Sequence, residues 1–303
     1  MASFASRAFS WQPILRLTYP VEAAMADYPN LNTVAYDVPR PHVARVTQNR
    51  PEARNAQSTE MTYELNMAFD YANQDDDIKV IVLAGAGPHF SSGHDMRGGG
   101  RPMTDFKPVG TWGNFTKPGM EGFMAREEEI YLQMCQRWRN LAKPTMAMVQ
   151  GKCIAGGLML AWACDIIIAS EDASFSDPTV GFGVNGVEYF MHPWELGARK
   201  AKEFLFTGDP LSAQEAYEAG MVNRVVAREA LEDFTLDMAE KIATKPAFAL
   251  KVSKLSVNQM LEAQGQQVAL SAAMSLQELA HSHNLQVFGT AVDPTGVPAA
   301  VKR

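Results

Sequence analysis

Residues 146–170 constrain the fold of this 303-residue chain more than any other segment does. An apolar stretch at 146–149 leads into a turn of small residues, and a second apolar stretch at 166–169 closes the run. Between them, Gly156 and Gly157 open a short apolar segment, so the run predicts a strand, a helix and a strand. Backbone N–H groups at a helix start carry partial positive charge, and glycine lets an oxygen approach them closely. The run therefore predicts a place where backbone donors hold a developing oxyanion.

A second segment of the same kind lies upstream. The apolar stretch 80–83 predicts a strand, and the residues after it include Phe90-Ser-Ser-Gly-His-Asp95. Taken alone, either segment is an ordinary tight turn after a strand. Together they bring two strand ends to one place, where two backbone donors can point at one oxygen.

Four segments in this order resemble the crotonase (enoyl-CoA hydratase/isomerase) superfamily, from about residue 43 to the last helices. They are residues 45–55, 90–95, 154–166, and 206–209 with 213–225. The resemblance implies an α/β fold with a spiral ββα core, acyl-CoA thioester substrates, and homotrimers or dimers of trimers. It also implies that the oxyanion donors are the backbone N–H groups of His94 and Gly156.

The acid/base pair of the family's hydratases is absent from its usual positions. The resemblance places one glutamate three residues after the oxyanion-hole glycine and another after the proline of a Gln-Pro-Glu motif. Here those positions are Met159 and Thr179, which are expected to contact substrate without transferring protons. Neither a thioether nor an unactivated hydroxyl can shuttle a proton near neutral pH. Thioester activation is therefore expected without the usual hydration machinery.

A replacement acid/base is sought in residues 180–194, which run beside the acyl group in this family. Pro193 suits the first turn of a helix, so His192 is expected at the helix start, with Glu188 four residues earlier. The two can form a catalytic pair in one space. The equal alternative is an ion-paired or solvated Glu188 and a hydrogen-bonded His192. Some crotonase branches take carboxylates from this loop, which ranks Glu188 ahead of His192.

Further candidates carry weaker signals. Arg54 and Arg97 are expected at the CoA phosphates, and Lys251 and Lys254 resemble phosphate-binding lysines of relatives. Additional substrate-binding candidates are Ser92, Asp95 and Trp112. Asp177 is either a base or a hydrogen-bonded strand end. Residues 127–129, three glutamates, are expected to form a charged solvent face from which one side chain can reach the pocket.

Composition excludes several classes of protein. A net charge of −7 argues against nucleic acid or an anionic membrane as the main partner. Three cysteines without metal-ligand spacing predict no metal site, and no cofactor is expected beyond coenzyme A as part of the substrate. The odd cysteine count and the lack of a secretory signal favour the cytoplasm. The mitochondrial matrix is the alternative if the first residues are a transit peptide.

Three regions are expected along the chain. Residues 1–28 form an N-terminal extension that is either disordered or not native, residues 29–227 the spiral core, and residues 228–303 a C-terminal helical region. Expected strands lie at 34–38 and 43–47, and expected helices at 59–73, 124–141, 228–243 and 246–285. Residues 96–122, rich in Gly, Pro and Thr, are expected to form a mobile loop over the site.

Three functions remain open at this level. The first is an acyl-CoA enzyme whose enolate is protonated, hydrated or cleaved with help from Glu188 or His192. The second is a hydrolase of a CoA thioester or a β-diketone that uses the same oxyanion hole. The third, suggested by the two missing glutamates, is a non-catalytic acyl-CoA-binding paralogue.

Overall fold

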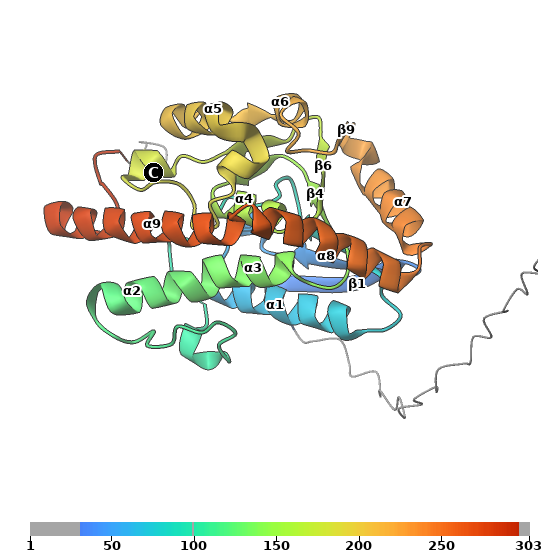
Figure 1. The fold of residues 1–303 in the computed structure, drawn as a ribbon, viewed down its shortest axis with the longest axis horizontal. Helices are drawn as coiled ribbons and strands as arrows, with labels where there is room; N and C mark the ends of the chain where they lie inside the picture. Colours follow the sequence, from blue (N-terminus) through green and yellow to red (C-terminus); the bar gives the residue numbers. More distant parts are fainter. Residues whose placement is uncertain (1–30, 99, 297–303) are drawn as a thin grey trace, which may run out of the picture.

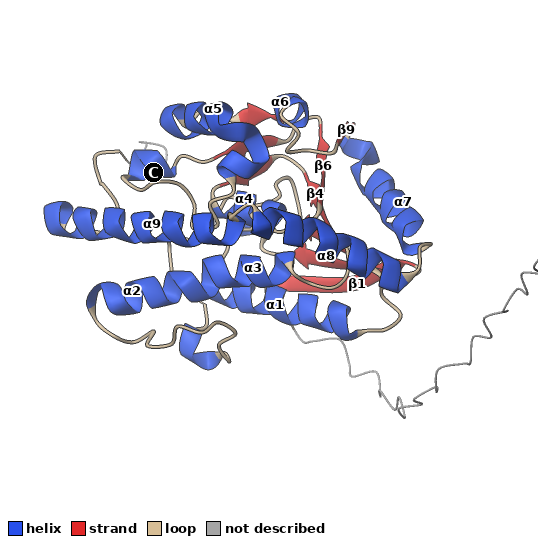
Figure 2. Ribbon diagram, in the orientation of Figure 1, coloured by secondary structure: helices blue, strands red, loops and turns tan. Residues whose placement is uncertain are grey.

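A computed structural model describes residues 31–98 and 100–296, and the expected extension at residues 1–28 lies outside them (Figure 1). The described chain forms two β-sheets surrounded by helices (Figure 2). The strand order is β1-β2-β3-β4-β6-β9 in the larger sheet and β5-β7-β8 in the smaller one. This mixed architecture confirms the predicted α/β class.

The larger sheet combines one antiparallel pair with a parallel series. β1 (Val34–Arg40) and β2 (Val43–Gln48) are antiparallel, as their alternating pattern predicts. Four strands then add in parallel, namely β3 (Val80–Gly85), β4 (Thr145–Val149), β6 (Ile166–Ser170) and β9 (Arg224–Val226). The smaller sheet comprises β5 (Lys152–Ile154), β7 (Ser174–Ser176) and β8 (Leu211–Ser212).

The parallel arrangement places the segments after β3 and β4 beside each other. The Ser91 N–H donates to the Lys152 backbone oxygen, and the Ile154 N–H donates to the Ser91 oxygen, both at 3.0 Å. The two segments that the sequence singled out are therefore neighbours at one edge of the larger sheet.

The helices surround the sheets and form the C-terminal region. They are α1 (Thr59–Gln74), α2 (Gly119–Glu127), α3 (Met134–Arg139), α4 (Gly156–Trp162), α5 (His192–Thr207), α6 (Ala213–Glu218), α7 (Leu231–Ala243), α8 (Ala247–Ala263) and α9 (Gln266–Phe288). The single helix expected at 124–141 is interrupted, because a π-helical turn (Glu128–Gln133) joins α2 to α3. The helix expected at 246–285 is divided by Gly265, whose φ of 90° cannot continue an α-helix.

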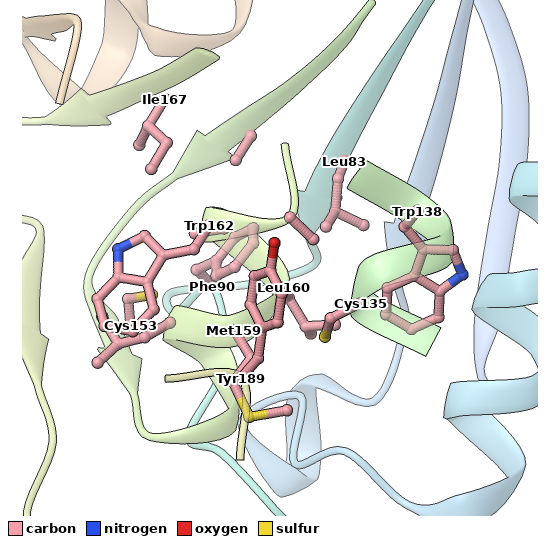
Figure 3. Packing of buried hydrophobic residues seen from close by; sticks show 14 of the residues in the cluster. Leu83, Phe90, Cys135, Trp138, Cys153, Met159, Leu160, Trp162, Ile167 and Tyr189 are labelled. Atoms are coloured by element: carbon pink, nitrogen blue, oxygen red, sulfur yellow. The ribbon is translucent and has the colours of Figure 1, made fainter. Parts of the chain in front are cut away.

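The core lies on both faces of the larger sheet. Along β3, Val80, Val82 and Ala84 face α7, while Ile81 and Leu83 face the larger cluster that includes α1, α3 and α4. Figure 3 shows part of this larger cluster, where Met159, Cys135 and Tyr189 lie close together. Every residue of α4 is buried, so the packed side chains of this helix hold the glycine turn with which it begins. None of the helices in the described residues is long and apolar enough to cross a membrane.

Candidate active site

Two unsatisfied backbone donors lie at the edge of the larger sheet. In the described part of the chain, neither the His94 N–H nor the Gly156 N–H donates a hydrogen bond to another residue. The two segments approach each other closely at Gly93, which has a φ of 91°. A Cβ added to Gly93 would lie only 3.4 Å from the Gly156 nitrogen. Unpaired backbone N–H groups are rare in protein interiors, so two together indicate a place for an anionic ligand atom.

The turn before α4 is strained. Ala155 has φ 46° and ψ −111°, a conformation that non-glycine residues rarely adopt. Its N–H donates to the Ser176 oxygen at 2.9 Å, which holds the peptide in place. Backbone strain of this kind costs about 1–3 kcal/mol and clusters at functional sites. Here the strained residue immediately precedes the Gly156 N–H.

The His94 imidazole lies directly over Gly156. A Cβ added to Gly156 would lie 2.4 Å from the ring, so only glycine fits. The ring stacks on Tyr131 with centroids 3.8 Å apart and is 17 % exposed. Burial lowers the pKa of His94 to about 4, so the ring is neutral at pH 7.

Glu188 is the carboxyl group beside this ring. Its Oε2 lies 3.6 Å from His94 Nε2, and its side chain is 5 % exposed. That separation exceeds a hydrogen bond, and both atoms lack a hydrogen-bond partner among the described residues. Burial raises the pKa of Glu188 to about 7, which suits a group that takes and returns protons near neutral pH.

His192 has a different partner from the one the sequence suggested. The expected pairing with Glu188 does not form, because Nε2 of His192 lies 2.8 Å from Asp177 Oδ2. Both side chains are fully buried, and Trp162 and Phe190 pack against the imidazole. The Pro193 signal was correct, since α5 begins at His192. The His192–Asp177 pair is internal to the fold. This arrangement matches the alternative given for His192, a hydrogen-bonded histidine without a partner in Glu188.

Asp177 acts as a hydrogen-bond acceptor for the loop that carries Glu188. Besides His192, it accepts from the Thr179 N–H and hydroxyl and from the Val187 N–H. Burial alone would raise the pKa of Asp177, but the hydrogen bonds from His192 and Thr179 lower it below its ordinary value. The Val187 contact fixes the backbone next to Glu188.

The remaining predicted residues have varied surroundings. Arg54 and Arg97 are exposed near the His94 segment. Asp95 pairs with Arg50 at 2.8 Å, and Ser92 donates its N–H to the Arg54 oxygen. Met159 is fully buried in α4, while Trp112 is 49 % exposed on a surface groove away from Glu188. Lys254 is unavailable to a phosphate, because it pairs with Asp165 at 2.8 Å.

The expected solvent face at residues 127–129 was wrong. Glu129 is 1 % exposed and accepts hydrogen bonds from the Val109 and Gly110 N–H groups, which anchors the loop before α2. The loop expected at 96–122 ends earlier than predicted, because α2 begins at Gly119. Glu128 is 7 % exposed. Glu127 points toward Glu278 and His281 of α9, two residues that sequence reasoning missed. Their spacing on α9 matched an ordinary packed helix, so no local signal marked them.

Comparison with known proteins identifies the family of the chain. The model of the enoyl-CoA hydratase/isomerase family matches residues 40–292. EchA13 of Mycobacterium tuberculosis, whose name calls it a candidate enoyl-CoA hydratase, is 42 % identical over 254 residues, covering 82 % of this chain and 80 % of its own length.

Solved structures show the same similarity. A probable enoyl-CoA hydratase from Mycobacterium smegmatis is 45 % identical with a TM-score of 0.78, covering 86 % of this chain and 99 % of its own. A monofunctional enoyl-CoA isomerase from the same species is 28 % identical with a TM-score of 0.60, covering 76 % and 94 %. Because the family model matches well over half of the sequence, the chain belongs to the enoyl-CoA hydratase/isomerase family, within the crotonase superfamily.

Proposed function

We propose that this protein moves a proton on an enoyl-CoA thioester, with Glu188 as the acid/base. The observation that carries the proposal is a buried carboxyl group with one unpaired oxygen, 3.6 Å from the imidazole of His94, whose backbone N–H is unpaired like that of Gly156. The thioester oxygen would accept from the His94 and Gly156 N–H groups. These groups stabilise the negative charge that develops on this oxygen when a proton leaves the adjacent carbon.

The proton transfer requires only one carboxyl group. Glu188 in its ionised form takes a proton from a carbon beside the thioester, and the electron pair of that C–H bond moves into the enolate. The protonated Glu188 then returns a proton to a carbon further along the chain, which moves the double bond. Isomerisation is therefore the reaction proposed first, since Met159 and Thr179 occupy the positions of the usual hydration pair.

Hydration is the second candidate, because EchA13 and the M. smegmatis protein are named as hydratases. Water addition needs one group to position water and another to protonate carbon, and the second has to come from outside the usual positions. Arg54 and Arg97 stay predictions for the CoA phosphates, and the cytoplasm stays the predicted location.

The test is to incubate the purified protein with short, long and aromatic enoyl-CoAs and follow products by mass and retention time. A change in retention time without a change in mass would support isomerisation, and a gain of water would support hydration. Release of free CoA would favour the hydrolase alternative instead. Binding without conversion across the whole panel would contradict the proposal and favour a non-catalytic protein.

Self-association stays a prediction, supported by the outer surface of the last two helices. Large apolar side chains are exposed there, including Phe248, Leu255, Val257, Met260, Val268, Leu276 and Leu279. Exposed apolar surface of this extent is typical of subunit contacts. We expect a homotrimer or a dimer of trimers, and light scattering on the purified protein measures it. A monomeric mass at micromolar concentration would contradict the expectation.

A further inference from the structure

A second group of titratable side chains lies between α2 and α9. It consists of Glu127 at the end of α2 and Glu278 and His281 on α9, and it is called the rear cluster below. Glu127 and Glu278 lie within hydrogen-bonding reach of each other and within electrostatic range of Glu188. His281 Nε2 lies 3.6 Å from Glu127 Oε2. The charges of the rear cluster and of the proposed acid/base therefore act on one another.

Buried oxygens of the rear cluster lack a donor. Glu127 Oε2 and both carboxyl oxygens of Glu278 accept no hydrogen bond from any described residue, and the same holds for Glu188 Oε2. Glu278 is 7 % exposed and Glu188 5 % exposed. Buried acceptors in such number are rare unless protons or water occupy the space between them. Two facing carboxyl groups satisfy each other when they share one proton.

Contacts of His281 fix which of its ring nitrogens can exchange a proton. Nδ1 lies 2.6 Å from the Ala291 backbone oxygen, to which it donates, and the Phe123 ring packs against the imidazole. In the neutral ring, Nε2 is then the acceptor, with the Gln277 amide nitrogen at 3.3 Å and Glu127 Oε2 at 3.6 Å. Glu127 has the most exposed side chain of the rear cluster, at 13 %, against 7 % for His281 and 5 % for Glu188, so solvent reaches the rear cluster most readily at Glu127.

We propose that the rear cluster is a proton relay through which Glu188 exchanges its proton with water. This inference rests on the proposed function of Glu188. Glu127 and Glu278 are assigned here as positioning residues, because they act through Glu188. The protonated Glu188 gives its proton to the Glu127–Glu278 pair, so that one O–H bond breaks and another forms. The pair then holds two protons and passes one to His281 Nε2 or to water.

The protonation states fit this order of events. Burial raises the pKa of Glu127 well above its ordinary value, and the charges of Glu188 and Glu278 raise it further. Burial also raises the pKa of Glu188 and of Glu278 to about 7. Burial therefore favours a bound proton on each of these carboxyl groups, as proton sharing within the rear cluster requires. The other titratable or charged groups that interact with these side chains are His94, Arg126, Glu128, Tyr131, Cys135 and Asp177.

Deuterium exchange measures proton transfer through the relay independently of turnover. In D2O, a saturated acyl-CoA can lose and regain hydrogen at the carbon beside the thioester but cannot be hydrated or isomerised. Uptake of deuterium there therefore reports how fast Glu188 exchanges its proton with solvent. The matching enoyl-CoA reports turnover. The ratio of deuterium uptake to turnover is the quantity to compare between variants.

Glu127→Gln and Glu278→Gln are each expected to lower this ratio roughly tenfold. The effect is smaller than the ~10²-fold or more lost with a group that transfers the proton directly. Glu127→Asp, which keeps a carboxyl group, should recover part of the ratio. Glu195→Gln is the matched control, because Glu195 is a half-buried carboxyl group whose pKa burial also raises to about 7, yet it interacts with Arg139 instead of Glu188.

The outcomes distinguish the relay from the proposed function. If the wild-type protein shows neither deuterium uptake nor turnover, the function of Glu188 is contradicted. If uptake and turnover both occur and both need Glu188, yet neither glutamine variant changes their ratio, the relay alone is overturned. Thermal melts of both variants establish whether each one folds. If Glu127→Gln does not fold, Glu278→Gln alone tests the relay.

Discussion

Replacing Glu188 with Gln is expected to lower turnover about 10³-fold, within the range for loss of a general acid/base. Glutamine keeps the size and hydrogen-bonding atoms of the side chain but cannot take a proton from carbon. Binding of the CoA ester should change little, because the two backbone donors remain. Initial rates over the enoyl-CoA panel and a separate binding titration measure the two effects. Turnover within a few-fold of wild type would mean that another group moves the proton.

The pH dependence of the wild-type protein should follow the same residue. As a base, Glu188 acts only when ionised, so kcat/KM should rise with pH and level off above about 7. The contribution of Glu188 to the stability of the folded protein should change with pH in the opposite direction. Because the folded pKa lies above the unfolded value, the folded state binds the proton more tightly, and stability falls as pH rises from about 4.5 to about 7. Glu188→Gln should reduce both slopes, which pH-rate profiles and thermal melts test.

Asp177→Asn is the control for a carboxyl-to-amide change in the same part of the chain. Asp177 is fully buried and satisfied by four donors, so the amide would leave at least one donor facing another. Breaking a buried pair of this kind costs about 3 kcal/mol or more. The thermal midpoint should therefore fall with Asp177→Asn and hold with Glu188→Gln. The reverse pattern would mean that Glu188 stabilises the fold and that Asp177 does not, which contradicts the assignment.

The second large effect is expected from the Gly156 N–H. Proline at this position removes the N–H, and α4 begins here, where a helix tolerates proline. Any Cβ at Gly156 also displaces the His94 ring, so the comparison is made in a His94→Ala background, which removes that ring. In that background Gly156→Pro should turn over about 10²–10³-fold more slowly than Gly156→Ala, the loss found for one oxyanion donor.

Equal rates for the proline and alanine variants would contradict a role for this N–H. The thermal midpoints of the two double variants serve as the control, since they share the added Cβ and differ in the N–H and in the rigidity of the ring. A difference in rate without a matching difference in midpoint assigns the effect to the donor. A loss of structure in the proline variant alone would appear in the melt first.

Local patterns predicted most of the fold. Alternating residues located β1 and β2, and the glycine pair located the start of α4. A capping box at the start of α6 is equally local, with the Ser212 hydroxyl accepting from the Glu215 N–H. Each of these features depends on residues within a few positions of one another, so the sequence contains the whole cause.

The partners of Glu188 could not be predicted in this way. Four residues of separation suggested His192, but the start of α5 turns that ring into the core, where Asp177 binds it. The neighbour that Glu188 has instead, His94, is brought to it by the packing of a distant loop. The prediction that the three consecutive glutamates face solvent was wrong for a similar reason. They are buried by α9 and by the loop before α2, which are distant from them in the sequence or packed through long-range contacts.

The C-terminal helix also fixes the loop that leads to Glu188. Asn284 donates to the Gly183 oxygen, the Asp293 N–H donates to the Phe182 oxygen, and Asn185 donates to the Ala273 oxygen. Two of these contacts join residues 88 and 101 positions apart in the sequence. A nascent chain can therefore form its larger sheet and its glycine turn before the residues that hold the neighbouring loop have been made. Until those residues are made, the loop that leads to Glu188 lacks these contacts.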